Sequence, residues 1–220
     1  KEADSLIGAF LTEKHIKHLI TEDTEVFKEN GDLLCVLKKN AVSNNILENA
    51  RIPFRKSAKQ SNNRGSASGD IDKLYKIGDK IDGRVIGKIN GSKYIPILSN
   101  GKLSKTCYSL PVNSSVIGFM DRYPRIPYCR TTSFSQSHFN EYKLCIPYIQ
   151  SINEVFKRYA PHRYKVQKAM ADLSSQDFII NNTAFTTVTV NKNFRTAGHK
   201  DQGDLKDGFG NLGVISRGKY

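Results

Sequence analysis

Residues Ala184–Asn191 read AFTTVTVN, and this stretch decides the fold that we expect for the chain. Valines alternate with threonines along it, and a period of two with β-branched side chains predicts a β-strand. A glycine-bearing turn follows, and just after it come His199 and Asp201, one residue apart. In an extended chain, side chains at i and i+2 point to the same side, so this pair could supply two ligands of a 2-His-1-carboxylate iron site. The spacing alone leaves open a plainer interpretation, an exposed histidine beside a solvated carboxylate.

The composition is that of a soluble globular protein. The chain has 220 residues, of which 38% are hydrophobic and 25% are charged. No apolar run approaches the roughly 20 residues of a membrane span, and Leu6–Leu11 is too short for a signal peptide, so we expect no membrane association. The four cysteines are scattered without a CxxC pair. This predicts reduced thiols in an intracellular protein, nuclear or cytoplasmic, and a viral source stays open.

A strong excess of positive charge points to a polyanionic partner. Lysines and arginines number 34 against 21 acidic residues, which gives a formal net charge of +13. Nucleic acid is the commonest polyanion, and we expect DNA; a contribution to solubility alone, or a codon bias, is the alternative. The proline-rich loop 121–130 interleaves Arg122, Arg125 and Arg130 with two tyrosines. Such a loop suits a nucleic-acid groove, although its tyrosines could instead pack inward.

Helix-like and strand-like segments together predict an α+β fold in three parts. We expect a helical N-terminal region over 1–54, a polar loop or linker over 55–70, and a main domain over 71–220. The segments expected within the main domain are a hairpin at 84–98, helices over 147–172 interrupted at Pro161, and strands at 116–120, 177–180, 184–190 and 212–216. Short strands with glycine-rich turns indicate a β-sandwich or jelly roll as the core of this domain.

Three segments, in order, resemble the TET/JBP family of Fe(II)- and 2-oxoglutarate-dependent DNA dioxygenases, especially its phage and protist members. They are Asn62–Gly65 (NNRG), Ile152–Gln167 (INEVFKRYAPHRYKVQ) and Ala184–Leu212. The last segment contains a strand, an Asn-x-Asn-x-Arg-Thr motif, His-x-Asp, Gly-Asp and Gly-Phe-Gly-Asn-Leu in that order. The resemblance runs from about Ser61 to the last residue, whereas residues 1–54 match nothing that we recognise.

The resemblance implies a double-stranded β-helix, or jelly roll, that holds Fe(II) and 2-oxoglutarate. His199 and Asp201 would be the first two iron ligands. The residues that the resemblance associates with 2-oxoglutarate are Arg64, Asn191 and Arg195.

On the substrate side, the resemblance implies hydroxylation of the methyl group of a 5-methylpyrimidine, thymine or 5-methylcytosine, in DNA. Asp204 lies where family members touch the target base, and Asn193 is a further candidate. The base must leave the stack to reach a buried metal, while the basic loop with Arg122, Arg125 and Arg130 would hold the DNA. Which pyrimidine is oxidised, and the oligomeric state, stay open.

One feature departs from the family pattern. The family has a second iron-binding histidine well after His-x-Asp and an arginine beyond it, but none of the 19 residues after Asp201 is a histidine. We therefore expect that the C-terminal part of the catalytic domain is missing from this chain. Two other functions stay open, a catalytically inactive DNA-binding module with an oxygenase-like remnant and a 2-oxoglutarate-dependent protein hydroxylase.

Overall fold

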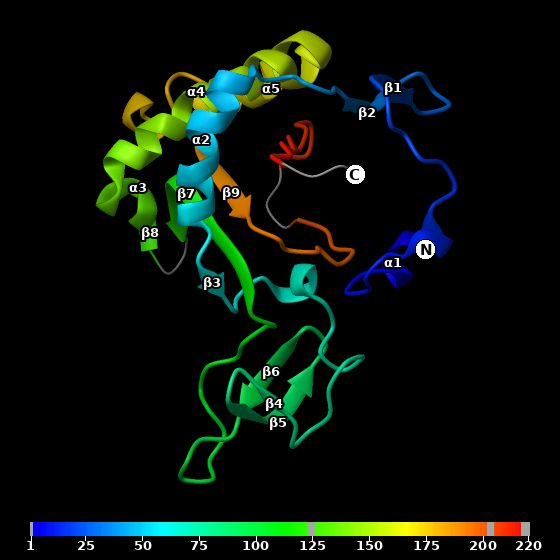
Figure 1. The fold of residues 1–220 in the computed structure, drawn as a ribbon, viewed down its shortest axis with the longest axis vertical. Helices are drawn as coiled ribbons and strands as arrows, with labels where there is room; N and C mark the ends of the chain where they lie inside the picture. Colours follow the sequence, from blue (N-terminus) through cyan, green and yellow to red (C-terminus); the bar gives the residue numbers. More distant parts are fainter. Residues whose placement is uncertain (1, 123–125, 202–204, 217–220) are drawn as a thin grey trace. The chain divides into compact units, whose positions relative to one another are not determined.

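The computed structural model describes residues 2–122, 126–201 and 205–216, and it mixes α-helices with antiparallel β-strands (Figure 1). The α and β content agrees with the predicted class. The chain forms two compact units, each assembled from three separate stretches of sequence. Unit 1 comprises Lys1–His18, Ala58–Ser115 and Asn191–Gln202, and unit 2 comprises Leu19–Ser57, Val116–Val190 and Gly203–Tyr220. No helix among the described residues is long and apolar enough to span a bilayer.

Unit 2 is built around the long helix α4 (Phe139–Tyr159). Buried side chains recur along one side of α4 every three or four residues, the period that places them on one face: Tyr142, Cys145, Ile149, Asn153 and Phe156. Helix α2 (Asn44–Ser57) lies beside α4 (Figure 1), and the rings of Phe54 and Tyr148 meet edge to face at 5.3 Å.

Helix α4 ends at Ala160, where Pro161 opens α5 (Pro161–Asp172). A proline is tolerated at the first helical position because its missing N–H has no partner there anyway. The predicted break between two helices at Pro161 is therefore confirmed, although α4 begins at Phe139, earlier than expected. The short helix α3 (Ser133–Ser137) precedes α4.

The strands of unit 2 gather on the C-terminal half of β7 (Val112–Arg122). This half pairs with β8 (Ile126–Thr131) and with β9 (Thr187–Asn191), so the predicted strand around Ala184–Asn191 is confirmed. Ile117 and Ile180 are fully buried in the core that these strands share with α4. The strand predicted at 116–120 lies within β7 and is confirmed. The strands predicted at 177–180 and 212–216 are wrong: a 3₁₀ turn, η3 (Gln176–Phe178), occupies the first half of 177–180, and 212–216 has no regular secondary structure.

Residues 1–54 are helical only at their ends, so the predicted helical region is wrong in its middle. The helical pieces are α1 (Glu2–Ser5), the 3₁₀ turn η1 (Glu13–His15) and α2. Between them, β1 (Thr24–Phe27) and β2 (Leu33–Leu37) form an antiparallel hairpin. Its turn contains Gly31 with φ +82°, a conformation that glycine adopts without a steric cost.

Unit 1 contains a small sheet with its own core. The strands β4 (Lys80–Ile81), β5 (Arg84–Asn90) and β6 (Lys93–Pro96) are antiparallel neighbours in that order (Figure 1). The sheet buries four large side chains: Ile71, Ile81, Ile86 and Tyr94. The predicted hairpin at 84–98 is confirmed, and its turn residues are Gly91 and Ser92, directly after Asn90.

The rest of unit 1 consists of short pieces. The N-terminal half of β7 pairs with β3 (Gln60–Ser61), and a 3₁₀ turn, η2 (Gly65–Ser68), follows β3. Both short elements lie in the stretch 55–70 that we expected to be a loop or linker, where the small side chains of Ser57 and Ser68 are buried. The predicted domain boundaries stay a prediction.

Candidate active site

The segment after β9 carries half of the predicted site residues, and its first residues run beside the start of β7 within unit 1. The Ser114 hydroxyl donates a hydrogen bond to Asn191 Oδ1, and Lys192 N donates to the Asn113 carbonyl at 3.0 Å. The β-pairing of β9 therefore continues one residue beyond the strand and fixes where the segment enters unit 1.

The turn before His199 is held by backbone hydrogen bonds to two other stretches of unit 1. Ala197 N donates to Ala67 O at 2.9 Å, and Gly198 N donates to Ala9 O at 2.9 Å. Gly8 N donates in turn to Gly198 O at 2.7 Å. A Cβ atom on Gly198 would lie 2.5 Å from the Leu6 carbonyl oxygen, so only glycine fits at this approach. The N-terminal stretch is thus part of the candidate site, a role that its sequence did not reveal.

His199 and Asp201 face each other, as the i, i+2 spacing predicts. His199 Nε2 lies 3.4 Å from Asp201 Oδ1, and the side chains are 27% and 68% exposed. His199 Nδ1 lies 2.8 Å from the Ala197 carbonyl oxygen. Because a carbonyl only accepts hydrogen bonds, the proton belongs on Nδ1, and in the neutral ring the lone pair of Nε2 is left for a cation. This donor pair fits a divalent metal with open positions, and the role of iron ligand stays a prediction.

A complete metal site is not present in the described part of the chain. Among residues 2–122, 126–201 and 205–216, no group of three or more His, Cys, Asp or Glu side chains could hold a metal ion. His199 and Asp201 are a candidate pair of ligands, and their role toward a metal stays a prediction.

Arg64 directly precedes η2, and its guanidinium interacts electrostatically with the Asp201 carboxylate. Its backbone N–H donates to Ser109 Oγ at 2.9 Å. Its Nε atom is buried without a hydrogen-bond partner in the described residues. Burial lowers the pKa of the Arg64 guanidinium, and the negative charge of Asp201 offsets part of this effect. A buried donor without an acceptor, on an arginine close to a candidate metal ligand, fits a carboxylate ligand such as 2-oxoglutarate.

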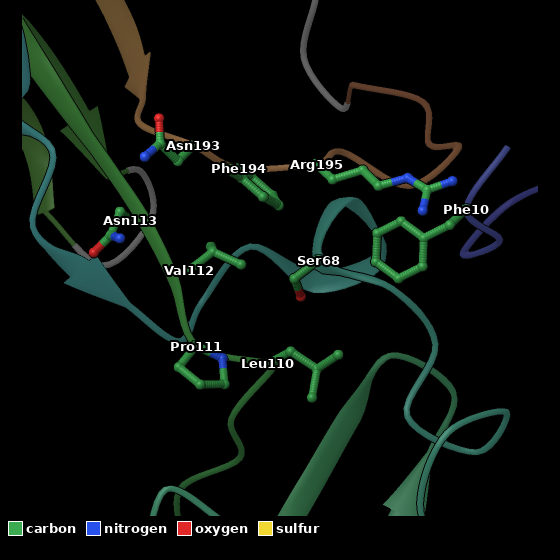
Figure 2. Close-up of a pocket in the computed structure, with 9 residues that line it drawn as sticks. All are labelled: Phe10, Ser68, Leu110, Pro111, Val112, Asn113, Asn193, Phe194 and Arg195. Carbon is green, nitrogen blue, oxygen red and sulfur yellow. The ribbon is translucent and has the colours of Figure 1, made fainter. Parts of the chain in front are cut away.

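A pocket of about 370 Å³ adjoins the segment after β9 (Figure 2). Asn193 and Arg195 line it together with Phe194, whereas His199, Asp201, Arg64 and Asn191 do not. The remaining lining residues are Phe10, Ser68, Leu110, Pro111, Val112 and Asn113.

The guanidinium of Arg195 is already engaged within unit 1. It lies 5.3 Å from the centre of the Phe10 ring (Figure 2) and donates to the Leu11 carbonyl. The structure therefore gives Arg195 a contact with the N-terminal stretch, while its predicted role toward 2-oxoglutarate stays a prediction. Phe10, which the sequence did not single out, contributes an aromatic face to the pocket.

The predicted DNA-contacting residues are only partly described. Arg125 and Asp204 lie outside the described residues, as does the side chain of Arg122 in β7. Arg130, in β8, has a buried Nε atom with no hydrogen-bond partner among the described groups. Tyr128 is 64% exposed, so the side chain of this tyrosine does not pack inward. The predicted loop 121–130 is wrong over 126–130, because these residues belong to β8.

About half of the chain is similar to known proteins. Residues 116–219, just under half of the chain, match the family model Tet_JBP, described as the oxygenase domain of the 2OGFeDO superfamily. Over these residues the chain is similar to the oxygenase domains of the TET/JBP family. The match confirms the resemblance for the second and third segments, and Arg64 lies outside it.

Several curated relatives are similar over about half of the chain. Thymine dioxygenase JBP1 of Trypanosoma brucei brucei is 37% identical over 112 residues, which cover 49% of this chain and 13% of the relative. The bifunctional helicase and thymine dioxygenase JBP2 of Trypanosoma cruzi is 35% identical over 105 residues, 46% of this chain and 9% of the relative. JBP2 of Leishmania tarentolae is 32% identical over 126 residues, 56% and 11% respectively. The chain thus spans about a tenth of these relatives, and no solved structure matches it significantly.

Proposed function

We propose that this chain is part of an Fe(II)- and 2-oxoglutarate-dependent dioxygenase that hydroxylates the methyl group of thymine in DNA. The observation that carries the proposal is the Tet_JBP match over 116–219, which includes the facing pair His199 and Asp201. The relatives are named thymine dioxygenases, and this favours thymine over 5-methylcytosine as the base. A core of the jelly-roll type belongs to the same proposal, as does a nuclear or cytoplasmic location where DNA is present.

Each residue of the candidate site has a role in this proposal. His199 and Asp201 would bind Fe(II) in a site that needs a further histidine. Arg64 would pair with a carboxylate of 2-oxoglutarate through its unpartnered Nε–H, in a half-buried position where a charged hydrogen bond is strong. Asn191, whose Oδ1 accepts from Ser114, would keep the segment before His199 in register.

Bound iron and 2-oxoglutarate would supply the O2 chemistry. One O2 and one 2-oxoglutarate are consumed per methyl group, one oxygen atom enters succinate, CO2 leaves, and the other oxygen atom becomes the new hydroxyl group. The thymine must first be extruded from the duplex, and Asp204, an acceptor when ionised, would accept a hydrogen bond from thymine N3–H. Cationic side chains, Arg130 among them, would hold the phosphates while the base is selected.

The test is an assay of the protein in its natural full length with Fe(II) and 2-oxoglutarate. Three DNA duplexes serve as substrates: one contains thymine, one contains 5-methylcytosine, and in one the pyrimidines are only uracil and cytosine. We expect succinate and 5-hydroxymethyluracil from the thymine duplex and no product from the duplex without methyl groups. His199→Ala and Asp201→Ala should each abolish product. Matched controls are His162→Ala, on the exposed side of α5, and Asp177→Ala, in η3, which remove the same kinds of side chain.

The alternatives give different outcomes in the same experiment. A protein hydroxylase would form succinate only with a protein substrate, and thymine DNA would not be altered. An inactive binding module would bind DNA with a steep salt dependence and form no succinate with any substrate. Either result would refute the proposed function.

A further inference from the structure

The small sheet of unit 1 carries a concentration of positive charge. Residues 71–108 contain eight lysines and arginines against three aspartates, a net charge of +5. This stretch surrounds a compact core of its own, so its charged side chains are distributed over strands and turns that are fixed by that core. None of these residues was singled out by the family resemblance.

Most of these cations have no anionic partner. Lys73 pairs with Asp70 at 2.9 Å and Arg84 pairs with Asp82 at 2.9 Å. The other six lysines are exposed, and none has a carboxylate within 4.0 Å in the part of the chain that the structure describes. They are Lys76, Lys80, Lys88, Lys93, Lys102 and Lys105. Six unpaired, solvated ammonium groups on one small sheet are available to an anionic partner.

The register of the sheet places three of them on one face. Lys88 lies opposite Ile95, and Lys93 lies opposite Asn90, so Lys88 and Lys93 are diagonal neighbours on the same side, with Cβ atoms about 7–8 Å apart. On β4, Ile81 points into the core, so the adjacent Lys80 points to the opposite side. Ile86 and Lys88 are two positions apart and would share a face in a regular strand. The register shift between them places Ile86 in the core and Lys88 on the opposite, exposed face.

Aliphatic side chains lie on the same face as these lysines. Ile95 and Ile97 follow Lys93 at two-residue steps and share its face, and Ile97 pairs with Leu103 across an isolated bridge. Ile97 and Leu103 are 39% and 50% exposed. A Cβ atom on Gly87 would lie 2.4 Å from Leu103 and 2.6 Å from Ile97, so these side chains lie flat against the strand where glycine leaves room.

We propose that Lys80, Lys88 and Lys93, hereafter the lysine face, contact the sugar–phosphate backbone of duplex DNA. The proposal rests on the proposed function, since it identifies where the substrate DNA is held outside the candidate active site. The ammonium groups pair with phosphates, and the aliphatic side chains on the same face contact the deoxyribose rings without reading the sequence. The lysine face therefore supplies affinity and orientation, and base selection belongs to the catalytic site.

The test compares two charge-matched triple variants of the 220-residue chain. The first is Lys80→Gln, Lys88→Gln and Lys93→Gln; the second is Lys143→Gln, Lys157→Gln and Lys165→Gln, on exposed positions of α4 and α5. Binding of a fluorescein-labelled 20-base-pair duplex is followed by anisotropy at several salt concentrations without metal or 2-oxoglutarate. Loss of three phosphate contacts lowers the magnitude of the slope of log K against log salt by about 2.7, and affinity near 0.1 M salt falls at least tenfold.

We expect the second variant to change the slope by less than about one, because its lysines do not contact the duplex. Equal effects of both variants, or an unchanged slope for the lysine face, would refute the proposal. Competition by poly-glutamate or by anionic lipid vesicles as effective as unlabelled duplex would assign the face to an acidic protein or a membrane. Binding is measured without turnover, so a failure of the proposed chemistry leaves this result intact and the two outcomes remain distinguishable.

Discussion

Arg64 combines a buried, unpartnered donor with proximity to a candidate metal ligand. A donor left unsatisfied costs free energy that a purely structural residue would not carry, so Arg64 is expected to lower stability in exchange for ligand binding. We predict that Arg64→Met, which keeps the length and removes the buried charge, raises the free energy of unfolding by about 1 kcal/mol. Urea unfolding measures the change.

The matched control is Arg55→Met, at an exposed position near the end of α2, where we expect a change within about 0.5 kcal/mol. In the full-length protein, Arg64→Met should also raise the KM for 2-oxoglutarate, because the variant binds this co-substrate less tightly. A destabilised Arg64→Met variant would mean that the guanidinium has a structural partner and would remove the reason for assigning it to 2-oxoglutarate.

The cysteines differ sharply in their environment. Burial in the core of unit 2 raises the pKa of Cys145 to about 12, whereas Cys35 and Cys107 are exposed. Since the thiolate is the nucleophile, Cys145 at pH 8 is almost entirely in the unreactive thiol form. We predict that iodoacetamide at pH 8 modifies Cys35 and Cys107 in the native protein and leaves Cys145 unmodified until urea is added. Peptide mass spectrometry gives the answer, and early labelling of Cys145 would contradict the packing of α4.

At the scale of single residues, the sequence predicted the facing of His199 and Asp201, because an i, i+2 pair in an extended segment depends only on local geometry. It did not predict the contact of Arg195 with Phe10, since 185 positions separate them and no local pattern brings them together. Asp204 and Arg125 lie outside the described residues, and their roles remain predictions.

Among the elements, the N-terminal stretch Leu6–Leu11 supports the turn at Ala197-Gly198 through backbone hydrogen bonds. We predict that Gly198→Ala destabilises the protein by about 1–3 kcal/mol. The added Cβ would lie 2.5 Å from the Leu6 carbonyl oxygen, and a backbone atom cannot move away as the end of a flexible side chain can. Gly210→Ala is the control, since its Cβ would meet nothing within 4 Å. Thermal unfolding measures both variants.

Hydrogen exchange adds a local measurement to the same comparison. Gly198→Ala should speed exchange of the amides of Gly8 and Asp70, which donate within this cluster, and Gly210→Ala should leave them unchanged. Equal stability of the two glycine variants would show that the N-terminal stretch does not hold the turn.

Strong periodic patterns predicted elements, and weak ones did not. The sequence predicted β9, the hairpin of β5 and β6, and the two helices that meet at Pro161, because alternation, an Asn-Gly turn and a proline are local signals. The sequence predicts helix where the β1–β2 hairpin lies, because the short apolar clusters there fit both the helical and the strand period. Only Asn30-Gly31 indicates a turn. Residues 212–216 have strand-like side chains, but Leu212 is 89% exposed and the described residues offer no strand partner.

At the scale of the whole molecule, sequence order and spatial units do not coincide. Unit 1 draws on residues near both ends of the chain, so a linear division into 1–54, 55–70 and 71–220 could not anticipate which segments lie together. The predicted site residues Arg64, Asn191, Arg195, His199 and Asp201 all fall in unit 1, although the sequence separates the first from the others by more than 120 positions. The family match covers parts of both units, because it includes Val116–Val190 of unit 2 and Asn191–Gln202 of unit 1.

The division into two units predicts which backbone amides a bound metal protects from hydrogen exchange. Mn(II) held by His199 and Asp201 should slow hydrogen exchange at Gly8, Ala197 and Gly198, whose amides donate in the cluster that supports the histidine. Exchange within α4, in unit 2, should not change. The measurement is made on untagged protein with and without millimolar Mn(II), since two protein ligands bind weakly. His199→Ala should abolish the protection in unit 1, and protection that persists in this variant would place the metal elsewhere.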